Sequence, residues 1–295
     1  MLKNKDNAMR KLIHIATVED NDKTVGEIIR RYFDISSHLL AYLKNNDGIY
    51  LNDQPVTVRK TVRTGDTLML VLRDAKSPNI VPVNLPLEIV YEDEDILVVD
   101  KPHNMPVHPS INNYTNTLAN AVMYYYRNEA FTFRAVNRLD RDTTGLVVIA
   151  KNRYSADILS RQMKDGVFKK EYTALVEGIL CQKEGEISAP IRRECESVIK
   201  RCVSSDGKYA LTKYRVMDER DNKSLVKIRL MTGRTHQIRV HFAYIGHPLC
   251  YDYLYGTEIK GKTFYLRCSR IEFNHPFTGK KTVFSLPSDK EISKL

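Results

Sequence analysis

The sequence lacks the features of a membrane protein or a secreted protein. No apolar run approaches the ~20 residues that a transmembrane helix needs. Residues 1–16 are basic, but they contain neither the apolar core nor the small-residue cleavage site of a secretory signal peptide. We therefore expect a cytoplasmic protein that does not bind a membrane.

Metal-binding and cofactor-binding motifs are also missing. The cysteines are odd in number and have no CxxC spacing, which argues against a disulfide framework and a cysteine zinc site: Cys181, Cys195, Cys202, Cys250 and Cys268. We expect reduced, partly buried thiols. His236, His241 and His247 are five and six residues apart, so they do not share a helix face as ligands. We expect no metal and no cofactor, and one or two backbone-bonded histidines.

Positive charge is what the sequence has in excess. The 295 residues include 46 Lys and Arg against 36 Asp and Glu, which gives a net charge of +10 and a pI of about 9.2. Such an excess suits a polyanionic partner, most commonly nucleic acid. A basic protein without such a partner has the same composition, so the motifs must decide.

The order of elements predicts a small unit followed by a large domain. We assign residues 1–12 to a flexible charged tail, 13–75 to a compact unit, 76–86 to a linker and 87–295 to the large domain. In the large domain, strand patterns are interrupted by a few helical ones. This predicts an α+β fold around a mostly antiparallel mixed sheet with flanking helices. We expect a monomer.

Two short helices and two short strands are predicted in the compact unit. Thr24 and Glu27 form a capping-box signature for a helix through Tyr32, and a second helix follows over 36–45. The strands are predicted over 49–56 and 66–72. The unit resembles a small RNA-binding domain seen in one ribosomal small-subunit protein and in some tRNA synthetases. Its basic face would include Arg30, Arg31, His38 and Lys44, although each also suits an ordinary solvated helix surface.

The most informative segment is NRLDRDTTGL, residues 137–146. It places an acidic residue, Asp140, in a polar turn directly before a buried strand, where its side chain can project into a cleft. Alone, this pattern favours an ordinary surface turn. Three further segments change that interpretation: YEDEDILVVDKPHNMPVHP (91–109), KKEYTALVEG (169–178) and MTGRTHQIRVHFAYIGHPLCYDYLYG (231–256).

From about Leu87 to the C-terminus, the chain resembles the RluA family of pseudouridine synthases. The four segments match the family in order and spacing, and residues 264–280 match its C-terminal region less tightly. The resemblance implies an enzyme that isomerises uridine in structured RNA. Ribosomal RNA is expected rather than transfer RNA, because the small RNA-binding domain is frequent in members that act on large-subunit RNA.

The resemblance also implies a role for individual residues. Asp140 falls on the catalytic aspartate, Tyr172 on the tyrosine that packs against the target base, and Arg234 on the arginine that pairs with the catalytic carboxylate. Leu266 falls on an apolar residue that lines the base pocket. Arg138 and Lys101 are supporting residues, with Lys101 assigned to architecture near the site.

The chemistry is compatible with these assignments. The reaction breaks the bond from ribose to a ring nitrogen, rotates the uracil and rejoins it through a ring carbon, without redox change or loss of a group. A carboxylate kept ionised in a partly dry pocket needs a neighbouring cation, and Arg234 suits that task. An aromatic ring such as that of Tyr172 replaces stacking that the uridine loses on leaving the RNA.

The sequence departs from the family pattern at four positions. Many relatives have His at Asn137, Ser at Thr144, and Gly at Asn104 and at Tyr251. The first two departures predict altered local hydrogen bonding. Asn tolerates a left-handed backbone, so the turn at Asn104 is expected to survive. Tyr251 is expected to reshape a loop near the pocket.

Three other functions stay open at this point. Asp142 lies two residues beyond Asp140, and two carboxylates are the machinery of a glycoside hydrolase. Asp142 more simply caps the turn with Thr143 and Thr144. A non-catalytic RNA-binding assembly factor would share the charge and the small domain, and the same isomerisation could act on transfer RNA.

Overall fold

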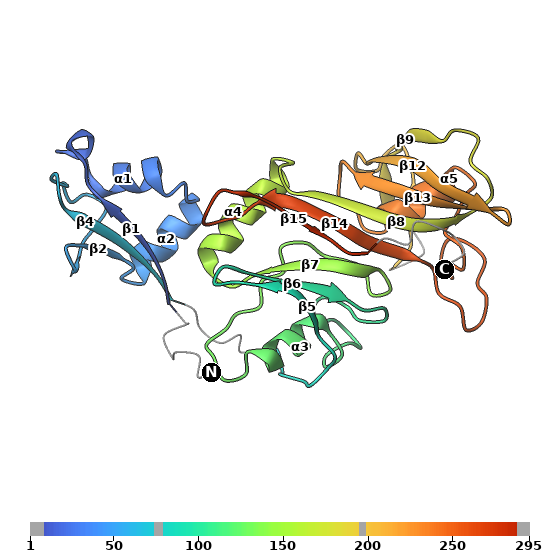
Figure 1. Cartoon of the computed structure of the whole chain (residues 1–295), viewed down its shortest axis with the longest axis horizontal. Coiled ribbons are helices and arrows are strands. Elements are labelled where there is room, and N and C mark those ends of the chain that lie inside the picture. The colour runs from blue at the N-terminus through green and yellow to red at the C-terminus, as the bar shows by residue number, and fades with distance from the viewer. Residues whose placement is uncertain (1–8, 74–78, 195–198, 288–295) are drawn as a thin grey trace.

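The computed structural model describes residues 9–73, 79–194 and 199–287 (Figure 1). Residues 1–8 of the expected tail, residues 76–78 of the expected linker and Cys195 lie outside them. The described chain forms a four-stranded sheet, a two-stranded sheet and a nine-stranded sheet, with helices beside them. The predicted α+β class is confirmed. No helix of the described residues is long and apolar enough to cross a membrane.

The four-stranded sheet belongs to the N-terminal unit and has the strand order β1-β4-β2-β3. Its elements are β1 (Met9–Ile15), the 3-10 turn η1 (Val18–Asp20), α1 (Val25–Tyr32), α2 (Ser37–Asn45), β2 (Ile49–Leu51), β3 (Gln54–Pro55) and β4 (Thr67–Arg73). Thr24 and Glu27 form the predicted capping box, and Ser36 caps α2 by accepting from the N–H of Leu39. Both helices and the strand over 66–72 were correctly predicted, whereas the single strand predicted over 49–56 is a hairpin of β2 and β3.

The prediction of a tail through residue 12 was wrong for residues 9–12. They form the first half of β1, which pairs antiparallel with β4 from Met9–Arg73 to Ile15–Thr67. Only Leu12 of β1 is fully buried, whereas Ile13 and Ile15 are exposed. A strand with one buried side chain lacks a strong apolar pattern, and its hydrogen-bond partner is far away in the sequence.

The nine-stranded sheet carries the pocket and has the order β5-β6-β7-β14-β8-β13-β12-β9, with β15 also paired to β14. Its strands are β5 (Glu88–Glu92), β6 (Ile96–Lys101), β7 (Thr144–Ala150), β8 (Lys169–Glu177), β9 (Glu184–Ser188), β12 (Leu211–Arg220), β13 (Lys223–Leu230), β14 (Leu266–Asn274) and β15 (Lys281–Ser285). The helices are α3 (Leu118–Tyr125), α4 (Arg153–Lys164) and α5 (Gln237–Tyr244), and a hairpin is formed by β10 (Ile191–Arg193) and β11 (Arg201–Val203). β7 and β14 pair in parallel, and the other strand pairs of this sheet are antiparallel.

The centre of the large sheet is its most deeply buried part. Six consecutive residues of β7, from Gly145 to Ala150, are buried, as the continuous apolar run predicted. From Val226 onward β13 alternates, with Val226 and Ile228 buried and Lys227 on the opposite face exposed. This buried centre is a rigid base for the turn that precedes β7, and therefore for Asp140.

Polar contacts join the N-terminal unit to the β5–β6 turn and to α4. Arg10 of β1 donates to Asp95 at 2.8 Å, and the side chain of Arg161 on α4 donates to Asp34 at 2.7 Å. The N–H of Ser36 donates to Asp157 of α4 at 2.9 Å. The α4 helix thus lies beside α2, as Figure 1 shows.

Candidate active site

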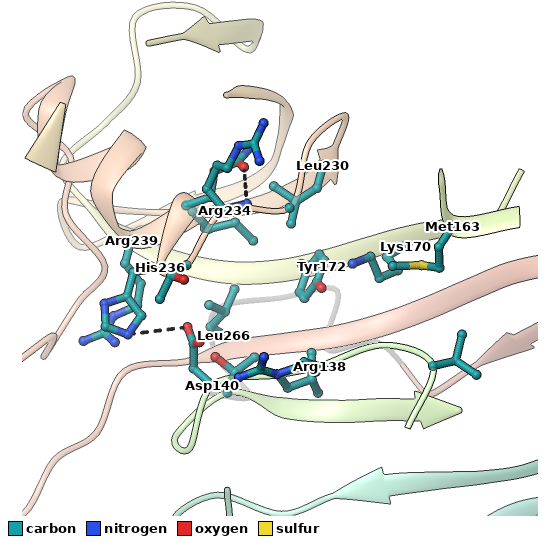
Figure 2. A pocket seen from close by; sticks show the side chains of 17 residues that line it. Arg138, Asp140, Met163, Lys170, Tyr172, Leu230, Arg234, His236, Arg239 and Leu266 are labelled. Atoms are coloured by element: carbon teal, nitrogen blue, oxygen red, sulfur yellow. Dashed lines mark hydrogen bonds and ion pairs between the residues drawn. The ribbon is translucent and has the colours of Figure 1, made fainter. Parts of the chain in front are cut away.

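One pocket brings together five of the six residues singled out by sequence. It has a volume of about 330 Å³ and lies between the turn before β7, strands β8 and β14, and the segment that leads from β13 into α5. Its lining includes Arg138, Asp140, Tyr172, Arg234 and Leu266 (Figure 2). Lys101 does not line the pocket, but it supports the turn that carries Asp140.

Asp140 is held by a short turn at the start of a buried strand. The N–H of Thr143 donates to the Asp140 carbonyl at 3.2 Å, which closes the turn, and Leu139 anchors it with a buried side chain. The Asp140 carboxylate is about one-third exposed (34%) and faces Nε2 of His236 at 4.0 Å. It is therefore a carboxylate within a pocket that substrate can still reach.

His236 was not singled out for Asp140 from the sequence, and the backbone explains its position. It is the N-cap residue of α5, and its backbone is left-handed, with φ 55° and ψ 19°. His is enriched in this conformation, which often occurs at functional sites. Its Nδ1 lies 2.8 Å from the hydroxyl of Tyr255, and that hydroxyl accepts the N–H of Arg201 at 2.9 Å. The bond to Tyr255 fixes the orientation of the ring, so that Nε2 faces Asp140.

The predicted pair between Arg234 and Asp140 is not formed. Arg234 is exposed at the rim, and its Nε donates to the carbonyl of Tyr209 at 2.9 Å. The backbone N–H of Arg234 donates to Oε1 of Gln237 at 2.9 Å, which closes the loop before α5. Figure 2 shows the Arg234 guanidinium turned away from Asp140. Arg234 therefore lines the pocket without neutralising Asp140.

The buried cation on the Asp140 side of the pocket is Arg239, five residues further along. Its Nε and Nη2 each donate to the carboxylate of Asp252 at 2.7 Å, and both side chains are almost inaccessible. Burial opposes the charge of Arg239, but the bonds to Asp252 and the nearby Asp140 raise its pKa. The sequence prediction selected Arg234 as the cation near Asp140, whereas the buried cation is Arg239 of the same motif. The two arginines differ in the side of the turn into α5 on which they lie, and the motif alone does not show that turn.

Tyr172 and Leu266 form the apolar floor of the pocket. Both are buried, and their strands pair antiparallel so that Leu266 lies opposite Ala174 and Cys268 opposite Tyr172. Burial raises the pKa of the Tyr172 hydroxyl well above its usual value, and the charge of Asp140 adds to this effect. Tyr172 is therefore protonated at neutral pH.

Lys101 supports the turn that carries Asp140. Its side chain is fully buried, and Nζ donates to three carbonyls: Pro102 at 2.9 Å, Met105 at 2.7 Å and Arg141 at 2.9 Å. Burial lowers the pKa of Lys101 to about 8, so the amine keeps its proton near pH 7. Three donors meet three acceptors, which ties the loop after β6 to the turn before β7.

The carboxylate of Asp142 is bonded to the side chains of Arg141 and Tyr253, whereas it was predicted to cap the turn with Thr143 and Thr144. Arg141 grips its carboxylate with two bonds of 2.9 and 2.8 Å, and the Tyr253 hydroxyl donates to it at 3.2 Å. Burial opposes ionisation of Asp142, but these bonds outweigh it and lower its pKa. Asp142 does not line the pocket, which leaves Asp140 without a second carboxylate there.

The departures at Asn104 and Asn137 fit the local backbone, whereas that at Tyr251 strains it. Asn104 has φ 56° and Tyr251 has φ 66°, so both keep the left-handed conformation that glycine favours. For the bulky Tyr251 this is strained, and its hydroxyl accepts from Lys223 at 3.1 Å. Buried Asn137 donates to the Leu146 carbonyl and accepts from the Val148 N–H. It is therefore part of the support of β7.

The remaining histidines bond as predicted. His241 is buried between the Thr212 hydroxyl and the Ala189 carbonyl, at 2.9 Å from each. His247 donates from Nδ1 to the Glu177 carbonyl at 2.8 Å. Both therefore have structural roles beside α5 and β8.

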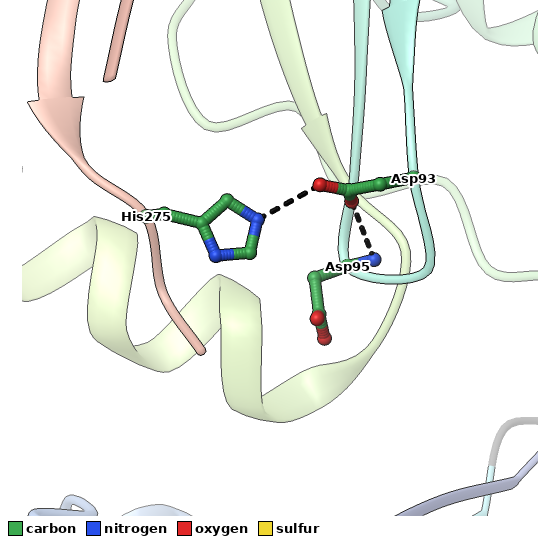
Figure 3. Close-up of side chains that lie close together, drawn as sticks. All are labelled: Asp93, Asp95 and His275. Carbon is green, nitrogen blue, oxygen red and sulfur yellow. Dashed lines mark hydrogen bonds and ion pairs between the residues drawn. The ribbon is translucent and has the colours of Figure 1, made fainter. Parts of the chain in front are cut away.

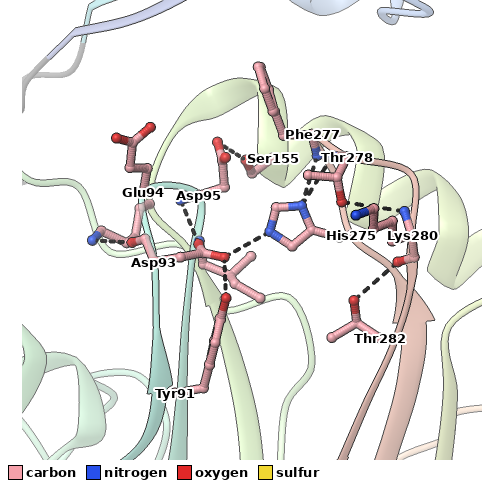
Figure 4. Close-up of polar contacts among 12 residues, drawn as sticks. Tyr91, Asp93, Glu94, Asp95, Ser155, His275, Phe277, Thr278, Lys280 and Thr282 are labelled. Carbon is pink, nitrogen blue, oxygen red and sulfur yellow. Dashed lines mark hydrogen bonds and ion pairs between the residues drawn. The ribbon is translucent and has the colours of Figure 1, made fainter.

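A second polar cluster lies away from the pocket and consists of Asp93, Asp95 and His275 (Figure 3). His275 donates to Asp93 at 2.9 Å, and the other Asp93 oxygen accepts the N–H groups of Asp95 and Ile96. Asp95 accepts from Asn152, Ser155 and Arg10. Figure 4 shows that these bonds connect the β5–β6 turn to the loop after β14. With its oxygens already bonded, this cluster is a structural junction between chain segments.

Both the sequence and the fold are similar to those of known proteins. Residues 95–244 match the family model described as RNA pseudouridylate synthase. The uncharacterized RNA pseudouridine synthase YjbO of Bacillus subtilis is 38% identical, over 88% of this chain and 94% of the relative. Ribosomal large subunit pseudouridine synthase D of Pasteurella multocida is 40% identical, over 80% of this chain and 72% of the relative. The solved structure of human RNA pseudouridylate synthase domain containing 1 is 28% identical, with a TM-score of 0.59 over 69% of this chain and 84% of that one.

Proposed function

The chain belongs to the RluA-type RNA pseudouridine synthases, and from that premise we propose that it isomerises specific uridines of ribosomal RNA with Asp140 as the catalytic carboxylate. The observation that carries the proposal is the position of Asp140, a partly exposed carboxylate above the apolar floor made by Tyr172 and Leu266. Ribosomal RNA is proposed because the relative from Pasteurella multocida is named for the large ribosomal subunit.

The pocket residues suit the steps of the reaction. The bond between ribose C1′ and uracil N1 breaks, a bond between C1′ and C5 forms, the C5 proton leaves, and N1 gains a proton. Asp140 supplies an ionised carboxylate as nucleophile, base or charge stabiliser. Tyr172 and Leu266 present apolar surface to the base, which holds the ring while allowing it to rotate.

Two side chains support the charge of Asp140. Arg239 contributes a buried cation, and its charge and that of Asp140 attract each other. His236 contributes a ring whose Nε2 faces Asp140 at 4.0 Å. His236 is the N-cap residue of α5 and Arg239 lies within the helix, so α5 positions both side chains.

The function is tested by incubating the full chain separately with large-subunit ribosomal RNA and with transfer RNA, followed by mapping of pseudouridine. We expect pseudouridine at one or a few positions of the ribosomal RNA, without strand cleavage or free base. Conversion of transfer RNA alone would move the substrate to that class. Free base would indicate a hydrolase, and unchanged RNA with retained binding would indicate an assembly factor.

Replacement of Tyr172 distinguishes stacking from acid–base chemistry. Tyr172→Phe is expected to keep most activity, because stacking uses the ring and the hydroxyl is protonated at neutral pH. Tyr172→Ala is expected to lose about 1–3 kcal/mol of transition-state stabilisation, the value of one base stack. Both effects are measured as kcat/KM on the converted RNA. Equal losses from the two substitutions would assign a chemical role to the hydroxyl.

Acidification is expected to destabilise the wild-type chain partly through His236. Burial lowers the pKa of His236 below its usual value of about 6.5. Below that value the unfolded state binds a proton that the folded state binds less readily, so this contribution to stability falls as the pH falls through 6.5. In urea unfolding, the loss between pH 7 and pH 5 should be smaller for His236→Asn than for wild type. His38→Asn, at an exposed position of α2, is the control and should behave as wild type.

We also propose that the N-terminal unit, predicted over residues 13–75 and extended to residue 9 by β1, is an RNA-binding domain and residues 87–295 the catalytic domain. All four members of the predicted basic face, Arg30, Arg31, His38 and Lys44, are exposed, and Arg31 pairs with Glu19 at 2.7 Å. Arg30→Gln/Lys44→Gln is expected to weaken RNA binding and to reduce the slope of log K against log salt by about 0.7–0.9 for each phosphate that is no longer neutralised. An unchanged slope would mean that this face does not contact RNA.

A further inference from the structure

A second hollow opens beside the pocket of Asp140. It has a volume of about 450 Å³ and is lined by the β10–β11 hairpin, the loop at 206–208 and the start of the segment before α5. Gly233, Arg234 and Thr235 line both hollows. The two hollows are therefore adjacent, with the loop that carries Arg234 at their junction.

Cations dominate the lining of this hollow, which we name the arginine groove. It has five cationic side chains and one carboxylate: Arg192, Arg193, Arg201, Lys208, Arg234 and Asp206. Arg192 pairs with Asp206 at 3.1 Å. Within residues 9–73, 79–194 and 199–287, no carboxylate forms an ion pair with Arg193, Lys208 or Arg234, and all three are exposed.

In contrast, two exposed cations of β12 pair with carboxylates of β9. On β12, Lys213 pairs with Glu186 at 3.2 Å and Arg215 pairs with Glu184 at 2.8 Å. The positive charge of the arginine groove is thus concentrated where a concave surface meets the pocket. Cations gathered in a groove create a site for a polyanion, because the field is focused there.

We infer that the arginine groove binds the sugar–phosphate backbone of the RNA strand next to the target uridine. The inference rests on the action of the enzyme on RNA. A uridine that enters the pocket must leave its stack, and the strand on at least one side of it must then cross the rim of the pocket. Arg234 stands at that rim, so its guanidinium is suited to a bidentate contact with a phosphate.

The charge of the groove is tested with Arg193→Gln/Lys208→Gln in the full chain. The matched control is Lys183→Gln/Arg220→Gln, which removes two exposed cations that pair with Glu219 and Asp221, toward the end of β12 opposite Leu211. Binding is measured against a fluorescent single-stranded oligouridylate at several salt concentrations. We expect the groove variant to bind more weakly, with a log–log salt slope reduced by about 0.7 for each phosphate that it no longer neutralises, and the control to match wild type.

A steric variant tests the path of the strand without changing charge. A side chain at Gly233 would project into open space at the junction, since a Cβ atom at this position would meet no other atom within 4 Å. Gly233→Leu is expected to raise KM on large-subunit ribosomal RNA more than it lowers kcat, and to leave the melting temperature unchanged.

The outcomes separate this inference from the proposed function. If wild type converts uridine and the groove variant keeps the wild-type salt slope and affinity, the groove does not bind RNA and the inference is wrong. Equal weakening by the groove variant and the far control would also contradict it, because any surface charge would then suffice. If wild type converts no uridine in ribosomal RNA, the substrate proposal fails, while the binding comparison on oligouridylate still decides the groove.

Discussion

Asp140→Asn is expected to abolish uridine isomerisation while most RNA affinity remains. An amide cannot act as a nucleophile, base or anionic stabiliser, so the loss should be on the order of 10⁴–10⁶-fold, as for other essential catalytic groups. Affinity should persist because it comes mainly from phosphate contacts spread over the basic surface. The fold should persist as well, since the Asp140 carboxylate is one-third exposed and its ionisable neighbour His236 is 4.0 Å away.

The comparison with Asp142→Asn makes this test specific. Asp142 is buried and bonded to Arg141 and Tyr253, so its substitution should lower stability by removing charge-assisted bonds. Single-turnover conversion, RNA binding and melting temperature are measured for both variants, and Asp140→Ala serves as a second form of the first. Measurable turnover by both Asp140 variants on the converted RNA would remove Asp140 from the catalytic role.

Arg239→Leu is expected to have the largest effect on stability. It leaves the carboxylate of Asp252 buried without its cation, and breaking a buried pair from one side typically costs about 3–5 kcal/mol. The N–H groups of Leu254 and Tyr255 also donate to Asp252, but they supply no full charge. Urea unfolding at neutral pH measures the loss. Arg239→Lys keeps the charge and loses the two-point grip, so it should fold with a smaller loss.

Turnover separates the two arginines of the motif. Arg239→Lys moves the cation that supports Asp140, so kcat should fall even at saturating RNA. Arg234→Gln removes an exposed side chain from the rim, so stability should stay within about 0.5 kcal/mol of wild type and the main change should be a higher KM. A loss of kcat confined to Arg234→Gln, with Arg239→Lys active, would restore Arg234 as the functional partner of Asp140.

Much of the fold could be predicted because its signals are local. The capping box of Thr24 and Glu27 lies within one helical turn, and the burial of β7 follows from a continuous apolar run. β1 was missed because its evidence is not local. Its hydrogen bonds go to β4, some sixty residues later, and it buries Leu12 alone, which Arg10 and Lys11 precede.

The sequence by itself determined the family, the α+β class and five of the residues that line the pocket, since motif order and spacing carry that information. Only the tertiary structure decided which of these residues meet. The backbone turn at His236, with its left-handed φ, points Arg234 to the rim and leaves Arg239 buried against Asp252. Such choices depend on the direction of a side chain leaving a turn and on a partner far away in the sequence. The φ angle of His236 sets the direction in which the chain enters α5, and the sequence pattern around His236 does not show that angle.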